Sequence, residues 1–147
     1  MFDRVPSLHD QPLAAVPPET LYRILQLRSQ VFVVEQDCVF LDLDGRDLDA
    51  GCRQLWIEDD GGDVVAVARV IDEGHARHIG RIVTAEAARG EGHAGRLLEH
   101  ALATSEPPWI MEAQARLARW YETFGFAVTG EEYMDDGILH VPMRRDA

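Results

Sequence analysis

Three glycines and two arginines lie together in the segment Arg89-Gly90-Glu91-Gly92-His93-Ala94-Gly95-Arg96, between a predicted strand and a predicted helix. Glycines let the backbone approach an anion closely, and the free N–H groups and positive dipole end of the following helix bind phosphate. Arg89 and Arg96 can add charge-assisted hydrogen bonds, and we expect Arg81 to flank the same turn. The segment therefore predicts a phosphate-binding site.

The same glycines also fit the dinucleotide fingerprint GxGxxG, and Glu112 falls near the offset of its ribose-binding acid. However, residues 84–89 separate the preceding strand from the first glycine, whereas that fingerprint needs an immediate tight turn. Residues 113–147 are also too few for a second nucleotide-binding half. A dinucleotide-binding domain and a glycine-rich turn that binds nothing remain as less favoured alternatives.

The composition excludes several kinds of chemistry. All fourteen basic residues are arginine, so a Walker-A loop, a Schiff-base enzyme, a pyridoxal enzyme and a protein kinase are excluded, because each needs a lysine. A formal net charge of −12 argues against a general nucleic-acid binder.

The two cysteines, Cys38 and Cys52, fit neither a CxxC motif nor a disulfide framework, and we expect no metal site. No apolar run approaches the ~18 residues of a membrane span, so we expect a cytoplasmic protein without a membrane partner.

The order of predicted elements indicates a single α+β domain over residues 1–147. Helical periodicity predicts helices near 18–35, 97–102 and 117–124. Apolar runs predict strands at 2–7, 55–58, 64–72, 78–83, 109–113, 128–133 and 138–143, with an acidic loop over 37–49. Strands and helices in this order favour a mixed sheet that is covered by helices.

Two motifs resemble the GNAT acetyltransferase superfamily. Arg89-Gly90-Glu91-Gly92-His93-Ala94 matches its pyrophosphate loop, Arg/Gln-x-x-Gly-x-Gly/Ala, and Tyr121-Glu122-Thr123-Phe124-Gly125-Phe126 is similar to its Tyr-x-x-Phe-Gly-Phe motif. Residues 20–144 are similar to the ElaA-like branch of the superfamily. The resembling segments are 27–36, 42–45, 68–70, 79–82, 113–115 and 136–140.

This resemblance implies a GNAT fold, with a mixed, mostly antiparallel twisted sheet, a splayed central strand and flanking helices. It also implies an acyl-CoA co-substrate, acetyl-CoA or another acyl-CoA, bound without a metal. The implied cofactor-binding residues are Ile82, Val83, Thr84, Arg89, Gly90, Glu91, Gly92, His93, Ala94, Gly95 and Arg96. The implied reaction is direct attack of an amine on the thioester, and the expected acceptor is a small-molecule or peptide amine.

The resemblance implies that Tyr121 protonates the departing thiolate, whereas its spacing alone fits a core aromatic. Glu35 and His140 are alternative general bases, and either could also bind the acceptor. We further expect Arg28 and Gln114 to bind the acceptor. Arg28 is one to two turns before Glu35 and could instead pair with Glu35, Asp42 or Asp44.

The acidic residues are concentrated in two segments. Residues 35–63 hold ten acids against two arginines, and residues 131–136 hold four more acids. We expect both segments to face the acceptor and to steer a cationic amine towards it.

A non-catalytic acyl-CoA-binding sensor is the main alternative function. A transferase of the homoserine-lactone type is a further one, because residues 31–35 faintly resemble that group. The sequence leaves a homodimer open.

Overall fold

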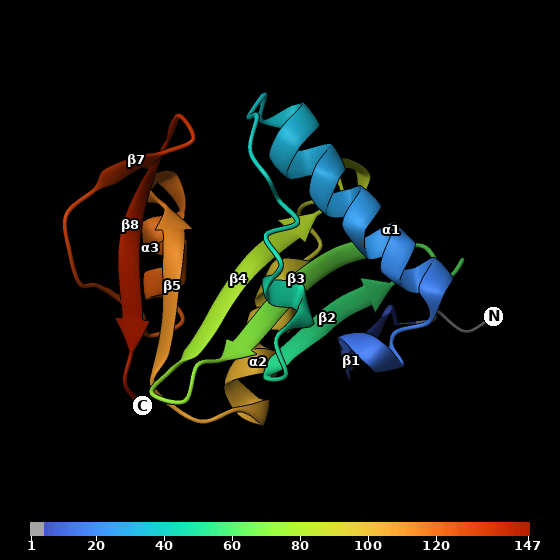
Figure 1. Ribbon diagram of the computed structural model, residues 1–147, viewed down its shortest axis with the longest axis horizontal. Coiled ribbons are helices and arrows are strands. Elements are labelled where there is room, and N and C mark those ends of the chain that lie inside the picture. The colour runs from blue at the N-terminus through green and yellow to red at the C-terminus, as the bar shows by residue number, and fades with distance from the viewer. Residues whose placement is uncertain (1–4) are drawn as a thin grey trace.

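The computed structural model describes residues 5–147, which form one eight-stranded sheet with helices on both faces (Figure 1). The strands are β1 Ser7–Pro12, β2 Cys52–Glu58, β3 Val64–Asp72, β4 Arg77–Thr84, β5 Trp109–Gln114, β6 Ala127–Val128, β7 Tyr133–Asp135 and β8 Ile138–Arg145. The α-helices are α1 Pro18–Arg28, α2 His93–Thr104 and α3 Ala118–Glu122. The strand order is β1-β2-β3-β4-β5-β8-β6, with β7 paired to β8.

Helices cover both faces of β2 and β3. On one face Leu97 and Leu98 of α2 pack with Leu55 and other buried side chains, and on the opposite face Ile24 of α1 packs with Trp56. Figure 1 accordingly shows α1 in front of the sheet and α2 behind it. Because both faces are buried, these strands are almost continuously apolar rather than alternating.

The sheet splits between β4 and β5. These two strands are parallel, but they pair only at Arg77 with Trp109 and at His78 with Ile110, and then diverge (Figure 1). The other strand pairs are antiparallel. The expectation of a mixed, mostly antiparallel sheet with a splayed central strand is confirmed. A doubly wound parallel sheet, which the dinucleotide alternative needs, is not present in residues 5–147.

A bulge in β4 lies beside this split. Val67 of β3 pairs with Val83, whereas Arg69, two residues further along β3, pairs with Gly80, so β4 holds one extra residue. Arg81 lies within the bulge and has a left-handed backbone (φ +51°). Such a bulge bends the strand and redirects its side chains.

The N-terminal elements differ from the predicted ones. β1 begins at Ser7 rather than covering 2–7, and residues 2–4 of that prediction lie outside the described part of the chain. β1 lies at the edge of the sheet, where its backbone pairs with β2. Its sequence is polar because only the Leu8 side chain packs on the core.

The first helix continues from Ser29 to Glu35 as a π-helix, in which the N–H of Gln36 donates to the carbonyl of Val31 (3.1 Å).

The predicted strand 128–133 is wrong for its central residues. β6 ends at Val128 and β7 begins at Tyr133, so residues 129–132 form no strand. The neighbouring residue on β8 is Pro142, which has no N–H to donate to a ladder. A Cβ on Gly130 would lie only 2.8 Å from the Pro142 side chain, so the chain passes too closely there for regular pairing.

Candidate active site

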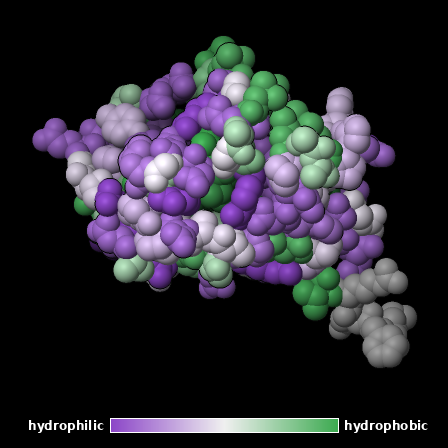
Figure 2. Space-filling model, turned by 60° about the horizontal axis from the view of Figure 1, so that its bottom comes forward, coloured by the Kyte–Doolittle hydropathy of each residue, from purple (hydrophilic) through white to green (hydrophobic). Residues whose placement is uncertain are grey.

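A cavity of about 720 Å³ lies where β4 and β5 separate. Its walls come from the end of the first helix, the following loop, β4, β5, α3 and the β7–β8 hairpin. The space-filling view shows a hollow near the centre of one face, surrounded mostly by hydrophilic residues (Figure 2). Its lining includes Glu35, Ile82, Val83, Thr84, Arg89, Ala94, Gln114, Tyr121 and His140 from the predicted site. The fold therefore brings together residues that the sequence separates by more than 100 positions.

One end of the cavity lies at the glycine-rich turn. Gly90 and Gly92 both have left-handed backbones (φ +84° and +82°), and Gly92 is the residue before the first turn of α2. A Cβ built on either glycine meets no atom of the described chain within 4 Å, so open space faces both. The first N–H groups of a twelve-residue helix are available to a ligand there. This arrangement fits a diphosphate.

Of the three arginines expected at this turn, only Arg89 lies in the cavity wall there. Its Nη2 donates to both carboxylate oxygens of Glu35 at 2.8 Å, and its Nε donates to the carbonyl of Thr84 at 3.2 Å. Arg96 instead donates to the carbonyl of Pro6, which holds it against the N-terminal segment. Arg81 lies at the bulge of β4 and pairs with Asp42, away from the turn.

Two further residues of the predicted phosphate site have packing roles. A Cβ on Gly95 would lie 3.3 Å from the ring of Phe124, so this glycine allows α2 to approach the α3 region. The buried His93 has its Nε2 2.9 Å from Glu91. Neither residue lines the cavity, and their part in the motif is to hold the turn on the helix.

The surroundings of Tyr121 are compatible with both roles that the sequence left open. Tyr121 is 7 % exposed and packs edge-on against Trp120 and Phe126, as a core aromatic does. It also lines the cavity. Burial raises the pKa of its hydroxyl to about 12, so the hydroxyl keeps its proton at any ordinary pH.

The two candidate bases differ in what they bind. Both oxygens of Glu35 accept hydrogen bonds from Arg89, so its carboxylate is already engaged. The Nδ1 of His140 lies 2.7 Å from the carbonyl of Ile138. A carbonyl can only accept, so in the neutral ring Nδ1 carries the proton and Nε2 carries the lone pair. His140 also stacks on Tyr133, with ring centroids 5.9 Å apart.

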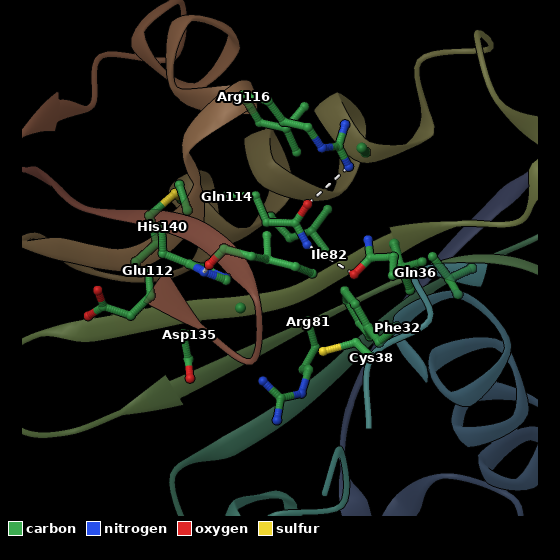
Figure 3. Close-up of a pocket in the computed structure, with 18 of the residues that line it drawn as sticks. Phe32, Gln36, Cys38, Arg81, Ile82, Glu112, Gln114, Arg116, Asp135 and His140 are labelled. Carbon is green, nitrogen blue, oxygen red and sulfur yellow. Dashed lines mark hydrogen bonds between the residues drawn. The ribbon is translucent and has the colours of Figure 1, made fainter. Parts of the chain in front are cut away.

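A chain of amide and guanidinium contacts crosses the cavity (Figure 3). Gln114 on β5 donates from Nε2 to Gln36 (3.2 Å) and accepts from Arg116 (3.0 Å). Cys38 reaches the carbonyl of Asp136 with its thiol (2.9 Å). These contacts tie the loop after the first helix to β5 and to the β7–β8 hairpin.

Sequence reasoning missed the role of this loop. Cys38 and Phe40 line the cavity, whereas Val39, Leu41 and Leu43 are exposed. The alternation over residues 38–43 is the signal that indicates an extended segment with one face against the protein.

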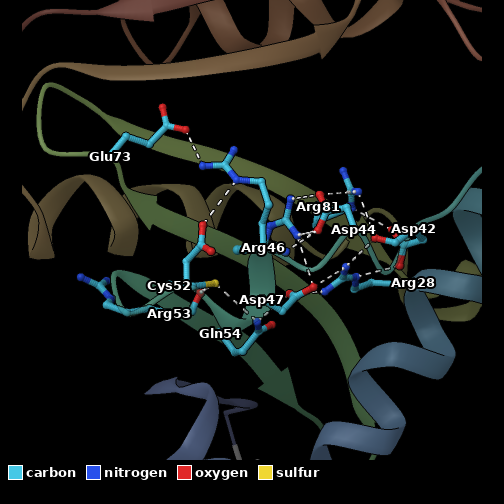
Figure 4. A network of polar contacts seen from close by, with 12 residues as sticks. Arg28, Asp42, Asp44, Arg46, Asp47, Cys52, Arg53, Gln54, Glu73 and Arg81 are labelled. Atoms are coloured by element: carbon cyan, nitrogen blue, oxygen red, sulfur yellow. Dashed lines mark hydrogen bonds and ion pairs between the residues drawn. The ribbon is translucent and has the colours of Figure 1, made fainter.

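Arg28 does not reach the cavity wall. It is 1 % exposed, and its guanidinium donates to Asp42 (3.0 Å) and Asp47 (2.7 Å) (Figure 4). The structure thus corrects the expectation that Arg28 contacts the acceptor. Its long side chain is used instead to neutralise two buried carboxylates, whose desolvation would otherwise be costly.

These contacts belong to a larger buried network. We call it the buried ion network, and its members are Arg28, Asp42, Asp44, Asp47, Gln54, Arg69 and Arg81. It holds three arginines and three aspartates, so its formal charge is balanced. Burial opposes ionisation of Asp44, but hydrogen bonds from Arg69 and the backbone of Arg46, together with the charges of Arg69 and Arg81, outweigh this effect and lower its pKa to about 2. The acids of loop 37–49 that enter this network cannot steer a cation, contrary to the sequence-based expectation.

Residues 5–147 lack two kinds of feature. No group of three or more His, Cys, Asp or Glu side chains is arranged to hold a metal ion. Within the same residues, no helix has the length and apolar character needed to cross a membrane.

Comparison with known proteins agrees with this geometry. Residues 42–147 match the acetyltransferase (GNAT) domain family. The chain is 47 % identical to a UPF0039 protein of Mycobacterium tuberculosis over 131 residues, 85 % of this chain and 83 % of that one. It is 40 % identical to protein ElaA of Escherichia coli over 150 aligned residues, 95 % and 94 % of the two chains.

Solved structures give the same result. The crystal structure of Escherichia coli ElaA has a TM-score of 0.89 at 35 % identity and covers 97 % of this chain and 100 % of that one. The crystal structure of an acyl-CoA N-acyltransferase from Pseudomonas aeruginosa has a TM-score of 0.90 at 36 % identity, over 96 % and 99 % of the chains. The chain therefore belongs to the GNAT acetyltransferase family, and its relatives include ElaA.

Proposed function

We propose that this acyltransferase moves an acyl group, most simply acetyl, from acyl-CoA to an amine by direct attack on the thioester. The proposal rests on the observation that Arg89 and Ala94 at the glycine-rich turn line the same cavity as Tyr121 and His140. Such a cavity gives a phosphate-binding end, a proton donor and a proton acceptor access to one bound substrate pair.

The diphosphate of CoA would be held by the backbone around Gly90 and Gly92, by the N-terminus of α2 and by Arg89. Beyond His78, β4 has no partner strand on its β5 side within residues 5–147. Its backbone groups near Ile82 and Val83 are therefore available to the amide groups of the pantetheine arm. The thioester supplies an activated acyl group.

His140 is the better general base of the two candidates. An amine must lose its proton before it can attack, and the lone pair on Nε2 of His140 can accept that proton. Glu35 is bound to Arg89, so its carboxylate would have to leave an ion pair first. We therefore assign Glu35 the role of an ion-pair partner that competes with phosphate for Arg89, rather than that of a proton acceptor.

Tyr121 is the proton donor for the departing thiolate. With a pKa of about 12, its hydroxyl is protonated whenever the thiolate forms and needs that proton. Negative charge that develops on the thioester oxygen can be stabilised by a backbone N–H of β4 near Val83 or Thr84.

The test is to incubate the purified protein with acetyl-CoA and a panel of primary amines, and to measure both thiol release and acetylated product. Thiol release that depends on an amine supports the proposal. Tight binding of acetyl-CoA without thiol release for any amine would overturn it, in favour of the non-catalytic acyl-CoA-binding module. Slow release without an amine is the hydrolysis background that each reaction must exceed.

A further inference from the structure

Arg81 and Asp44 are the members of the buried ion network that line the cavity. The Arg81 guanidinium extends from the bulge of β4 into the pocket, which Asp135 and His140 of the β7–β8 hairpin also line (Figure 3). The left-handed backbone of Arg81 is unusual for a residue with a side chain and is strained. Strain of this kind persists where the surrounding structure imposes it, and here the imposed conformation aims a cation into the cavity.

The network fixes the orientation of this guanidinium. Its Nε lies 2.7 Å from Asp42 Oδ1, and its Nη2 donates to the carbonyl of Asp42 (3.0 Å) and to Asp44 (3.3 Å). Despite this short distance Nε makes no hydrogen bond with Asp42 Oδ1, and Nη1 makes none with any of residues 5–147. Arg28 in the same network uses Nε, Nη1 and Nη2, so the free Nη1 of Arg81 is a feature of its position at the cavity.

The electrostatic surroundings of Arg81 favour an additional negative charge. Burial lowers its pKa, and so do the neighbouring charges of Arg69 and Arg28, despite the opposing effect of Asp42 and Asp44. The ring of Phe40 lies 5.8 Å from the guanidinium and covers it without compensating its charge fully. A carboxylate from a ligand would supply an acceptor for Nη1.

Another wall of the cavity has the complementary character. Asp135 and Asp136 lie in the β7–β8 hairpin, and Glu112 lies on β5 beside it. These carboxylates can attract an ammonium group, and His140 on the same wall can remove its proton. One wall thus suits a carboxylate and the other an amine.

We infer that the acceptor is an amine that also carries a carboxylate, of the amino-acid or short-peptide class, and that Arg81 binds this carboxylate. The inference rests on the proposed function and narrows its substrate class. Arg81 is then the residue that determines specificity, while Tyr121 and His140 perform the proton transfers.

The test compares matched acceptors in the thiol-release assay with acetyl-CoA. Each set contains an amino acid, its amide, and the amine that lacks the carboxyl group, for example phenylalanine, phenylalaninamide and phenethylamine. Short peptides are included in order to vary the distance between the amine and the carboxylate. We expect the best carboxylated acceptor to exceed its two partners in kcat/KM by roughly ten- to hundredfold, the usual range for a hydrogen bond to a charged group.

Substitution of Arg81 supplies the second arm. Arg81→Gln should lower kcat/KM for the carboxylated acceptor by roughly ten- to hundredfold and for the carboxylate-free amine by less than about threefold. The affinity for acetyl-CoA should not change. Arg81→Gly is a parallel variant in case Arg81→Gln folds poorly, because glycine adopts the left-handed backbone without strain.

The outcomes separate the two proposals. Equal turnover of carboxylated and carboxylate-free amines, or an equal loss for both in the Arg81 variants, would overturn this inference and leave the proposed function standing. Absence of thiol release with every acceptor would overturn the proposed function, and the inference with it.

Discussion

The two ends of the cavity are built in different ways. The phosphate end comes from a nearly continuous segment, residues 82–94, and relies on glycine backbone, a helix terminus and one arginine. The acceptor end comes from the loop 36–44, the bulge of β4, β5 and the β7–β8 hairpin, and it is held by the buried ion network. One end uses local backbone, and the other uses side chains from distant parts of the chain.

This difference predicts a division between binding and stability. Changes at the phosphate end should affect CoA affinity while costing little stability, because the turn lies at the surface. Changes in the buried ion network should cost much stability, because they leave buried charges without partners. The following experiments test this division, beginning with the largest expected effect.

Asp47→Ala should destabilise the protein by roughly 3–5 kcal/mol, since it leaves the buried Arg28 without one of its two carboxylates. Urea denaturation measures this loss. The matched control is Asp146→Ala, which removes a surface partner of Arg144 and should change stability little. Equal small losses for both variants would show that the network does not support the acceptor end.

Tyr121→Phe should lower kcat by roughly 10²–10⁴-fold and leave acetyl-CoA affinity unchanged, because the ring that packs in the core is retained. Steady-state kinetics and a binding isotherm give the two values. Tyr22→Phe, at an exposed position on α1, is the control and should behave as the wild type. Unchanged turnover in Tyr121→Phe would remove this hydroxyl from the mechanism.

Acid should lower the stability of the folded protein in a defined pH range, through protonation of Asp44 in the buried ion network. The pKa of Asp44 falls from 3.8 to about 2 in the folded state, so the folded protein prefers the ionised form. The resulting stabilisation is complete above about pH 4 and is lost as the pH falls towards 2. Denaturation midpoints measured from pH 6 to pH 2 should fall less steeply for Asp44→Asn than for the wild type. Parallel curves would contradict the assigned role of Asp44.

Gly92→Ala and Gly137→Ala form a matched pair. Both glycines have left-handed backbones (φ +82° and +79°), and a Cβ on either would meet no atom of the described chain within 4 Å. Each substitution should cost roughly 1–2 kcal/mol of stability. Gly92→Ala alone should weaken acetyl-CoA binding, by about fivefold, because its Cβ enters the phosphate space. A similar loss of affinity in Gly137→Ala would show that the effect is indirect.

Glu35→Gln should have the smallest effect and the opposite sign. Glu35 competes with phosphate for Arg89, and an exposed pair of this kind contributes about 0–1 kcal/mol. Its removal should therefore tighten acetyl-CoA binding by at most about fivefold, measured by titration calorimetry. Weaker binding would mean that Glu35 positions Arg89 for the phosphate instead of competing for it.

The prediction of a phosphate end rests on local information in the sequence. Glycines at 90 and 92 and the start of a helix are adjacent in the chain, so their spacing alone indicates their joint use. The same reasoning could not show the contacts of Gly95 with Phe124 and of Arg96 with Pro6, because these partners lie far away in the sequence.

The acceptor end could not be predicted in the same way. Loop 37–49 appeared as an acidic surface, because the sequence does not show that Arg28, Arg69 and Arg81 meet its aspartates. The left-handed backbone of Arg81 also depends on the register between β3 and β4, which no local pattern determines.

The sequence by itself determined the fold class, the family and the turn that would hold a diphosphate, because periodicity and short motifs act over neighbouring residues. Only the tertiary structure decided which charges neutralise one another and which face the cavity. Those outcomes depend on distances between residues such as Arg81 and Asp42, 39 positions apart, that only the packed sheet brings within 2.7 Å.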